Sequence, residues 1–143
     1  MGKVVSFINM KGGVGKTTLA VNIGYTLSKK LNKSVLLIDA DPQMNATQHI
    51  LNMDIERLQV ILNDPDKTIY GILSKNFKFP TVTTASAIGE KSSKKTKFDE
   101  VLEVNDKFHL IPSHLNIMSL NLIDSPHLLG HYLERNFKNK YDV

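Results

Sequence analysis

The sequence contains no cysteine, no run long and apolar enough to cross a membrane, and no internal repeat. Without cysteine the chain can form neither disulfide bonds nor thiolate-ligated metal sites. The first ten residues lack the apolar core and the cleavage site of a secretory signal. The composition is ordinary, with 41% hydrophobic and 22% charged residues. These features predict a cytoplasmic globular protein whose 143 residues form one domain.

The net charge of +4 is concentrated in one segment. Residues 75–97 carry six lysines and one acidic residue, Glu90, which gives the segment a charge of +5. Lysine, serine and threonine are frequent there and no helical stripe crosses the segment, so we predict a basic loop or insertion at 75–97. Two interpretations of its lysines remain open, namely contact with DNA phosphates and the solvation of a surface loop.

A glycine-rich segment follows the first apolar run and precedes a helical pattern. It consists of Lys11, Gly12, Gly13, Val14, Gly15, Lys16, Thr17 and Thr18. Glycines let successive backbone N–H groups turn toward one point, and the start of the following helix adds a favourable dipole. Lys16 can reach the β- and γ-phosphates of a nucleoside triphosphate, and the Thr17 hydroxyl can ligate Mg²⁺. The segment is therefore predicted to bind a triphosphate.

The segment departs from the usual phosphate loop because Met10 stands where the first glycine is expected, and a second lysine, Lys11, follows it. This pattern is the deviant Walker A motif, and the chain resembles the ParA/MinD superfamily of dimerising ATPases. In that family the early lysine reaches the phosphates of the partner subunit, where a cation can stabilise the charge on the transferring phosphoryl group. The resemblance implies ATP, Mg²⁺ and a homodimer on ATP binding, with Lys11 and Lys16 as catalytic residues.

Two aspartates, Asp39 and Asp41, follow the second apolar run, residues 35–38. Ligands gather at the carboxyl ends of strands in an open α/β sheet, so Asp39 is expected beside the phosphate loop. A carboxylate there can orient an attacking water or hold a water on Mg²⁺. The alternative interpretation is an Asx turn that leaves the strand.

The string from Asp39 to Thr47 also resembles the ParA branch, whose usual form is D-x-D-P-Q-G-N-A-T. Met44 replaces the glycine of that form, so the backbone turn is expected to differ there. By this resemblance Asp39 is tied to hydrolysis, and Asp41 lies nearby in the metal and water shell. The residues expected to hold Mg²⁺ are therefore Thr17, Asp39 and Asp41.

The hydrophobic pattern predicts an α/β fold with a P-loop NTPase-type, mostly parallel sheet flanked by helices. Residues 3–9 and 35–38 are apolar enough for buried strands, and a helix over 16–31 joins them in a right-handed βαβ unit. The expected inner stripe of this helix is Leu19, Ile23, Leu27 and Leu31, with Ala20 and Gly24 beside it. Further helices are expected near 44–52, 55–62, 68–74, 115–123 and 128–137, and short strands at 101–104 and 108–111.

Residues Tyr141, Asp142 and Val143 resemble the opening of the family's Walker B strand. The sheet is therefore expected to be incomplete at its carboxyl end, and residues 1–143 are interpreted as the amino-terminal part of a single ParA-like nucleotide-binding domain. The Walker B strand normally lies beside the phosphate-loop strand, so residues 3–9 are expected to lack a neighbour. Such an edge invites pairing with another chain.

The resemblance implies an ATP-binding and ATP-hydrolysing dimerisation switch in plasmid or chromosome partitioning. The implied partners of the full-length protein are non-specific DNA and a stimulating protein, and no membrane. A MinD-like membrane-positioning ATPase is one alternative, although that branch has other residues in place of Pro42 and Gln43. An electron-transfer protein like the nitrogenase iron protein would need cysteines for its cluster. A truncated nucleotide-binding module without hydrolysis is the remaining alternative.

Overall fold

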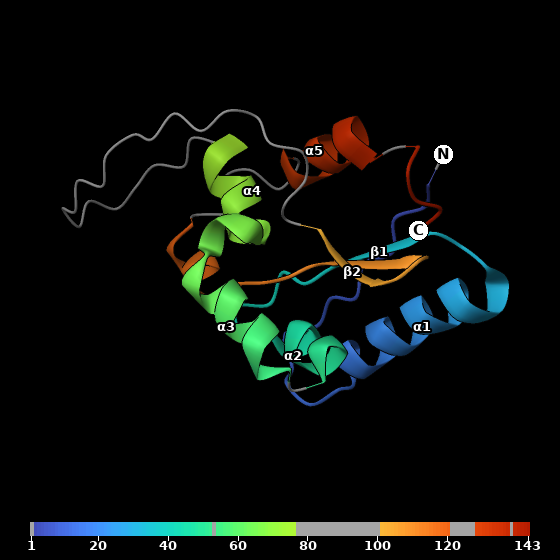
Figure 1. Cartoon of the computed structure of the whole chain (residues 1–143), viewed down its shortest axis with the longest axis horizontal. Helices are drawn as coiled ribbons and strands as arrows, with labels where there is room; N and C mark the ends of the chain where they lie inside the picture. Colours follow the sequence, from blue (N-terminus) through green and yellow to red (C-terminus); the bar gives the residue numbers. More distant parts are fainter. Residues whose placement is uncertain (1, 53, 77–100, 121–127, 138) are drawn as a thin grey trace.

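The computed structural model describes residues 2–52, 54–76, 101–120, 128–137 and 139–143, which form three layers (Figure 1). A three-stranded sheet with the strand order β1–β3–β2 lies in the middle. β1 (Val35–Ile38) pairs in parallel with β3 (Phe108–Ile111), and β2 (Leu102–Asn105) pairs antiparallel with β3. The α/β class is confirmed, and the described sheet combines one parallel pair with one hairpin.

Helices cover both faces of this sheet (Figure 1). On one side lie α1 (Lys16–Leu31), α2 (Asn45–Leu51) and α3 (Ile55–Asn63), and on the other α4 (Ile69–Asn76) and α5 (Leu128–Phe137). Two 3₁₀ turns, η1 (Pro65–Lys67) and η2 (Leu115–Ser119), complete the described helical elements. The predicted ends are confirmed to within two residues for these α-helices and for the three strands. Of the helix expected over 115–123, residues 121–123 lie outside the described residues.

Alternate residues of β3 pack into different layers. Phe108 is fully buried against α1, where the ring of Tyr25 meets it edge-on with the ring centres 5.9 Å apart. A Cβ added to Gly24 would lie only 3.0 Å from the Phe108 ring, so a glycine at this point lets α1 approach the sheet closely. Ile111 belongs to the main cluster on the opposite face, which also contains Ile69, Ile72, Leu73, Ile117, Phe137 and Tyr141.

The prediction for α1 is right in its ends and wrong in its buried face. Leu19 and Leu31 are more than half exposed, whereas Val21, Gly24 and Ser28 are buried. The physical reason is the position of the sheet under the helix. Strands β1 and β3 contact the side of α1 that carries the small residues. Within the described part of the chain, no strand lies under the leucine side.

The strand predicted over residues 3–9 is absent from the described structure, so the predicted βαβ unit is also wrong. A strand exists only where a neighbour supplies partners for its backbone N–H and C=O groups. Among the described residues, only Lys3 in this segment has a backbone bond to such a neighbour, from its N–H to the Asp142 carbonyl (2.8 Å). Val4 and Ile8 are more than 80% exposed. The expected shortage of neighbours for this segment is thus confirmed for residues 4–9.

The carboxyl-terminal residues lie between the amino-terminal segment and β1. The Asp142 N–H donates to the Ser34 carbonyl (2.7 Å), and the Leu36 N–H donates to the Val143 carbonyl (2.8 Å). Together with the bond from Lys3, these contacts bring both chain ends to the same edge of the sheet (Figure 1). This is where the resemblance places the start of the Walker B strand, beside the phosphate-loop segment.

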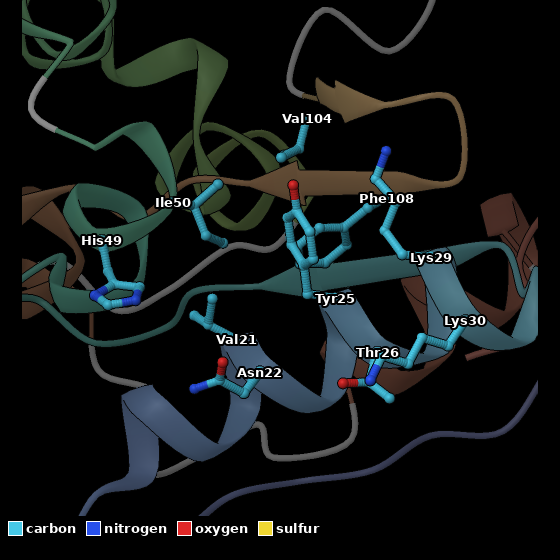
Figure 2. Close-up of a pocket in the computed structure, with 10 residues that line it drawn as sticks. All are labelled: Val21, Asn22, Tyr25, Thr26, Lys29, Lys30, His49, Ile50, Val104 and Phe108. Carbon is cyan, nitrogen blue, oxygen red and sulfur yellow. The ribbon is translucent and has the colours of Figure 1, made fainter.

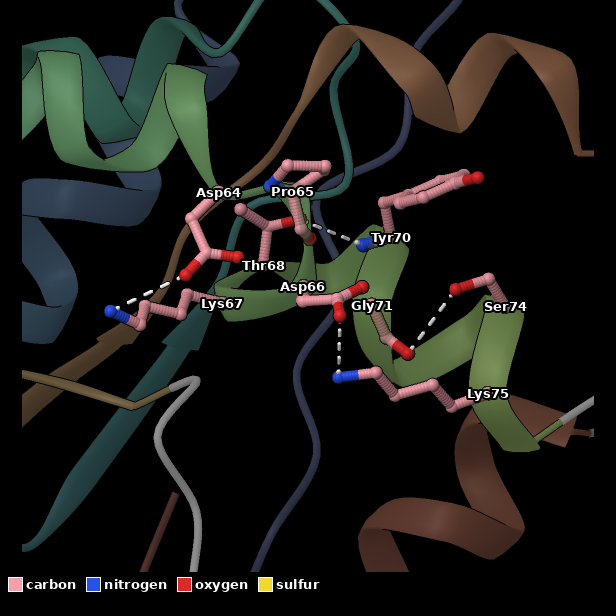
Figure 3. A network of polar contacts seen from close by, with 9 residues as sticks. All are labelled: Asp64, Pro65, Asp66, Lys67, Thr68, Tyr70, Gly71, Ser74 and Lys75. Atoms are coloured by element: carbon pink, nitrogen blue, oxygen red, sulfur yellow. Dashed lines mark hydrogen bonds and ion pairs between the residues drawn. The ribbon is translucent and has the colours of Figure 1, made fainter. Parts of the chain in front are cut away.

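The junction between η1 and α4 is held by short-range contacts (Figure 3). The buried Thr68 hydroxyl donates to the Pro65 carbonyl (2.6 Å) and accepts from the Tyr70 N–H (3.2 Å). A Cβ on Gly71 would overlap the backbone of Asp66, so the two segments touch directly. The Ile69 N–H donates to the Pro112 carbonyl (2.9 Å). Helix α4 is therefore anchored to the segment that follows β3.

None of the described helices is long and apolar enough to cross a membrane. Of the basic segment predicted at 75–97, only the first two residues belong to the described ranges. The lysines considered for DNA contact, Lys91, Lys94, Lys95 and Lys97, lie outside them.

Candidate nucleotide-binding site

The glycine-rich segment turns through two left-handed residues immediately before α1. Gly13 has a φ of 69° and Gly15 a φ of 84°, values that side chains with a Cβ disfavour. A Cβ at either position would meet no atom within 4 Å. The backbone conformation, and not a lack of space, is therefore the reason for glycine. Gly15 ends the loop and accepts the first helical hydrogen bond of α1 from the Leu19 N–H (2.9 Å).

The amino end of α1 is open to an anionic ligand. Gly15 provides no side-chain cap, and the first turn contains no acidic residue. The first N–H groups of a helix have no partner within the helix, and its dipole favours negative charge at this end. Thr17 and Lys16 are partly buried there, while Thr18 is exposed. These features suit a phosphate group.

Both lysines of the motif lie at the loop. The Lys16 ammonium donates to the Lys11 carbonyl (2.9 Å), so its side chain spans the loop. The Lys11 N–H in turn donates to the side-chain oxygen of Asn9 (2.9 Å). Sequence analysis did not single out Asn9. A short amide side chain two residues before a turn is the signal that would have identified it.

Asp39 is buried and fully engaged with the protein. Its exposed fraction is 4%. One carboxylate oxygen accepts from the Thr47 N–H (2.8 Å) and the Thr47 hydroxyl (2.7 Å), and the other accepts from the Asp41 N–H (3.1 Å). The Thr47 hydroxyl also accepts from the Ser113 N–H (3.1 Å). This network joins the end of β1, the first turn of α2 and the segment after β3.

Asp41 is more accessible than Asp39. It is partly exposed, and its two oxygens accept from the Gln43 N–H (2.9 Å) and the Asn45 side-chain amide (3.1 Å). Both aspartates thus accept a bond from the N–H two residues later, so the Asx turns of the alternative interpretation are present. Within these turns the Asp41 carboxylate stays partly exposed just after β1. Figure 1 shows α2, which follows this turn, beside the amino end of α1.

Met44 occupies a conformation that glycine adopts more readily. Its φ is 57° and its ψ 27°, and its side chain is buried with Leu51 and Ile61. The left-handed conformation costs a residue with a Cβ roughly 1–2 kcal/mol. The core contacts of the side chain offset that cost. Met44 thus adopts a left-handed conformation of the kind that glycine favours, while the predicted difference from the family's turn stays a prediction.

We expect Met44→Ala to destabilise the protein more than Met44→Gly. Both variants lose the buried side chain, at a cost of about 2–5 kcal/mol. Only glycine also removes the left-handed cost, so it should be the more stable of the two by about 1 kcal/mol. Urea unfolding followed by circular dichroism measures this order. Equal stability of the two variants would contradict a strained backbone at Met44.

Oxygen ligands for a hard cation are available at two points. The Thr17 hydroxyl lies in the first turn of α1, and the Asp41 carboxylate follows β1. Mg²⁺ prefers oxygen ligands and, with a nucleotide, needs only one or two from the protein. Within the described ranges no three His, Cys, Asp or Glu side chains gather into a metal site. The donor set fits a cation that arrives with the phosphates.

The family model described as AAA domain (AAA_31) matches residues 2–143, nearly the whole chain. That match includes the glycine-rich loop at residues 11–18 and the turn that carries Asp39 and Asp41. The chain belongs to the ParA-type partitioning ATPase family. The resemblance drawn from the deviant Walker A loop is thus confirmed.

Three curated relatives match this chain over less than half of their own length. The uncharacterized protein MJECL24 of Methanocaldococcus jannaschii is 40% identical over 82% of this chain and 37% of its own length. The sporulation initiation inhibitor protein Soj of Bacillus subtilis is 45% identical over 51% of this chain and 25% of its own length. The chromosome-partitioning ATPase Soj of Treponema pallidum is 56% identical over 32% of this chain and 17% of its own.

A solved structure has the same fold over nearly the whole chain. A plasmid partition protein from Borrelia burgdorferi superposes with a TM-score of 0.69 and 30% identity, over 99% of this chain and 54% of that one. The ParA-type chain therefore spans about half the length of this structure and less than half of the curated relatives it matches.

Proposed function

We propose that the ParA-type chain binds ATP with Mg²⁺ and that it serves as an ATP-driven dimerisation switch in plasmid or chromosome partitioning. The observation that carries this proposal is the loop itself. Two left-handed glycines lead directly into an uncapped helix, and the Lys16 ammonium lies across the loop. The names of the Bacillus, Treponema and Borrelia relatives support the partitioning role.

The phosphate loop supplies binding and charge stabilisation. Backbone N–H groups from Gly12 to Thr18 face the phosphates, and Lys16 contacts the β- and γ-phosphates. Lys11 is exposed, so its cation is free to reach the phosphates bound by a second copy. A positive charge delivered there stabilises the transferring phosphoryl group. The Thr17 hydroxyl and Asp41 hold Mg²⁺, which neutralises phosphate charge when it is bound.

The two aspartates have different roles in this proposal. Sequence analysis assigns hydrolysis to Asp39, yet only 4% of this residue is exposed, whereas Asp41 is partly exposed. Its burial supports a role in holding the turn, with an indirect effect on hydrolysis. The partly exposed Asp41 then orients the attacking water and the water shell of the metal. Asp39 remains necessary because it places Asp41.

The proposed partners are a second copy of the chain, non-specific DNA and a stimulating protein, each in the context of the full-length protein in the cytoplasm. The partitioning names of the relatives support this branch over a MinD-like membrane-positioning ATPase. A nucleotide-binding module without hydrolysis is the second candidate, because the chain spans only part of its relatives.

Single-turnover hydrolysis of ATP tests the proposal. We expect the chain to hydrolyse bound ATP, and Asp41→Ala to slow this step about 100-fold while ATP binding is retained. Lys11→Ala should slow hydrolysis and also reduce the ATP-dependent dimer seen by light scattering after size exclusion. Lys33→Ala, an exposed lysine after α1, is the matched control.

Binding without hydrolysis in the unmodified chain would favour the second candidate. A chain that does not bind ATP at all would overturn both. If Asp39→Asn lost hydrolysis and Asp41→Ala kept it, at equal stability of the two variants, the catalytic role would return to Asp39.

A further inference from the structure

A pocket of about 300 Å³ lies at the far half of α1, between this helix, the end of α2 and the edge of the sheet (Figure 2). Helix α1 contributes one face over two turns, from Val21 to Lys30. Val104 of β2 and Phe108 of β3 form the wall on the sheet side. A cavity of this size is at the small end of the range for ligand sites.

The middle of the pocket is aromatic and apolar. Tyr25 stands edge-on against Phe108, with an angle of 87° between the rings, and 47% of Tyr25 is exposed. Figure 2 shows its ring between Val104, Ile50 and Phe108, in the centre of the pocket. An exposed aromatic ring beside buried apolar side chains provides a platform for a flat apolar group.

Positive charge lies at one end of this platform. Lys29 and Lys30 line the pocket on the side away from His49 (Figure 2). Among the residues that the structure describes, no acidic side chain lines it. The ion pairs among the described residues, Arg57–Asp54, Lys67–Asp64 and Lys75–Asp66, all lie elsewhere. Lysines in the last turn of a helix also stabilise it by a favourable interaction with the helix dipole. That interaction does not depend on the pocket beside them.

The pocket is separate from the phosphate loop. Lys29 lies thirteen positions after Lys16 on the same helix, which corresponds to about 20 Å at 1.5 Å per residue. A triphosphate held at the amino end of α1 therefore places its phosphates well away from Lys29 and Lys30. The pocket is therefore distinct from the phosphate loop.

We propose that this pocket binds a small organic anion with a flat apolar body, of the class of aryl carboxylates. The body stacks against the exposed ring of Tyr25, which is held edge-on by the buried Phe108. The carboxylate lies beside the Lys29 ammonium, which Figure 2 shows on the same side of the helix as the Tyr25 ring, and Lys30 adds positive charge at the same end of the pocket. Charge at one end and an aromatic platform in the middle match such an amphiphilic anion. Inorganic phosphate would make no contact with the aromatic ring, and a neutral aromatic compound would make no charge interaction with the lysines.

Titration of the whole chain with 2-naphthoate, followed by amide shifts in two-dimensional NMR, tests the proposal. We expect saturable shifts centred on residues 21–30 and Val104. Tyr25→Ala and the double variant Lys29→Glu/Lys30→Glu should each weaken binding at least about tenfold. Tyr25→Phe should keep the affinity within about threefold, because the ring remains.

Two controls separate the site from general effects. Lys33→Glu reverses an exposed charge just beyond α1, outside the pocket, and Met118→Ala removes an exposed apolar side chain elsewhere. Neither should change the affinity for 2-naphthoate. Circular dichroism melting checks that every variant is folded, and the neutral analogue 2-naphthalenemethanol should bind at least about tenfold more weakly.

Three results would overturn the proposal: no saturable shifts up to the solubility of the probe, shifts that centre on residues 11–18 and disappear with ATP, and equal binding of the neutral analogue. None of these results counts against the proposed ATPase function, and the second of them would support ATP binding at residues 11–18.

Discussion

Lys16→Ala is expected to weaken ATP binding by about 100-fold. The lysine contributes charge-assisted hydrogen bonds to the phosphates, and the loss of about 3 kcal/mol corresponds to that factor. Fold stability should change little, because the ammonium makes one bond to the Lys11 carbonyl on the exposed side of the loop. The measurement is the anisotropy of a fluorescent ATP analogue titrated with protein, alongside urea unfolding of the variant.

Two lysine variants serve as comparisons for this experiment. Lys33→Ala removes a similar exposed charge away from the loop and should leave the affinity unchanged. Lys11→Ala should keep binding within a few-fold, since its cation is assigned to the phosphates of a second copy. Equal losses from Lys16→Ala and Lys33→Ala would mean that the analogue binds through general charge, and would contradict a phosphate site at Lys16.

Asp39→Ala is expected to destabilise the protein by about 3 kcal/mol, whereas Asp41→Ala should cost less than about 1 kcal/mol. Removal of the buried carboxylate leaves the N–H and the hydroxyl of Thr47 without their acceptor, and also frees the Asp41 N–H. The bonds of Asp41 lie at the surface, where water replaces them. Urea unfolding followed by circular dichroism gives the free energies for both variants.

Thr47 provides an independent check on the same network. Thr47→Val keeps the shape of the side chain but loses the hydroxyl that bonds Asp39 and Ser113, so it should cost about 1–3 kcal/mol. Thr47→Ser keeps the hydroxyl and should recover most of that loss. If Asp39→Ala were no more destabilising than Asp41→Ala, the buried network would contribute little, and Asp39 would not be a structural residue.

The candidate site was largely predictable because its chemistry lies in short segments. Gly13 and Gly15 adopt the left-handed conformations for which glycine is suited, and α1 begins at Lys16 as its pattern predicts. The turn at Asp39 and Asp41 also follows from local side-chain bonding. The accessibility of the two aspartates was not predictable, since the burial of Asp39 depends on Thr47 and on Ser113, which lies 74 positions further along the chain.

The errors in the predicted fold share one cause. Residues 4–9 and the leucine side of α1 have apolar patterns typical of buried elements, yet most of their large apolar side chains are exposed, namely Val4, Val5, Ile8, Leu19, Ile23 and Leu31. An apolar pattern in the sequence indicates only that the side chains are suited to burial. A neighbouring segment must also be present to cover them. In the described structure only the three carboxyl-terminal residues lie between the amino-terminal segment and β1.

The sequence by itself determined the helices, the short strands and the phosphate loop of this ParA-type chain, because backbone freedom, charge and hydrophobic period are properties of neighbouring residues. The tertiary structure alone decided which face of α1 is buried, that Met44 takes a glycine-like conformation at the cost of strain, and that Asp39 is buried while Asp41 remains accessible. Each of these depends on contacts between segments far apart in the chain, and their free energies arise only once the segments pack together.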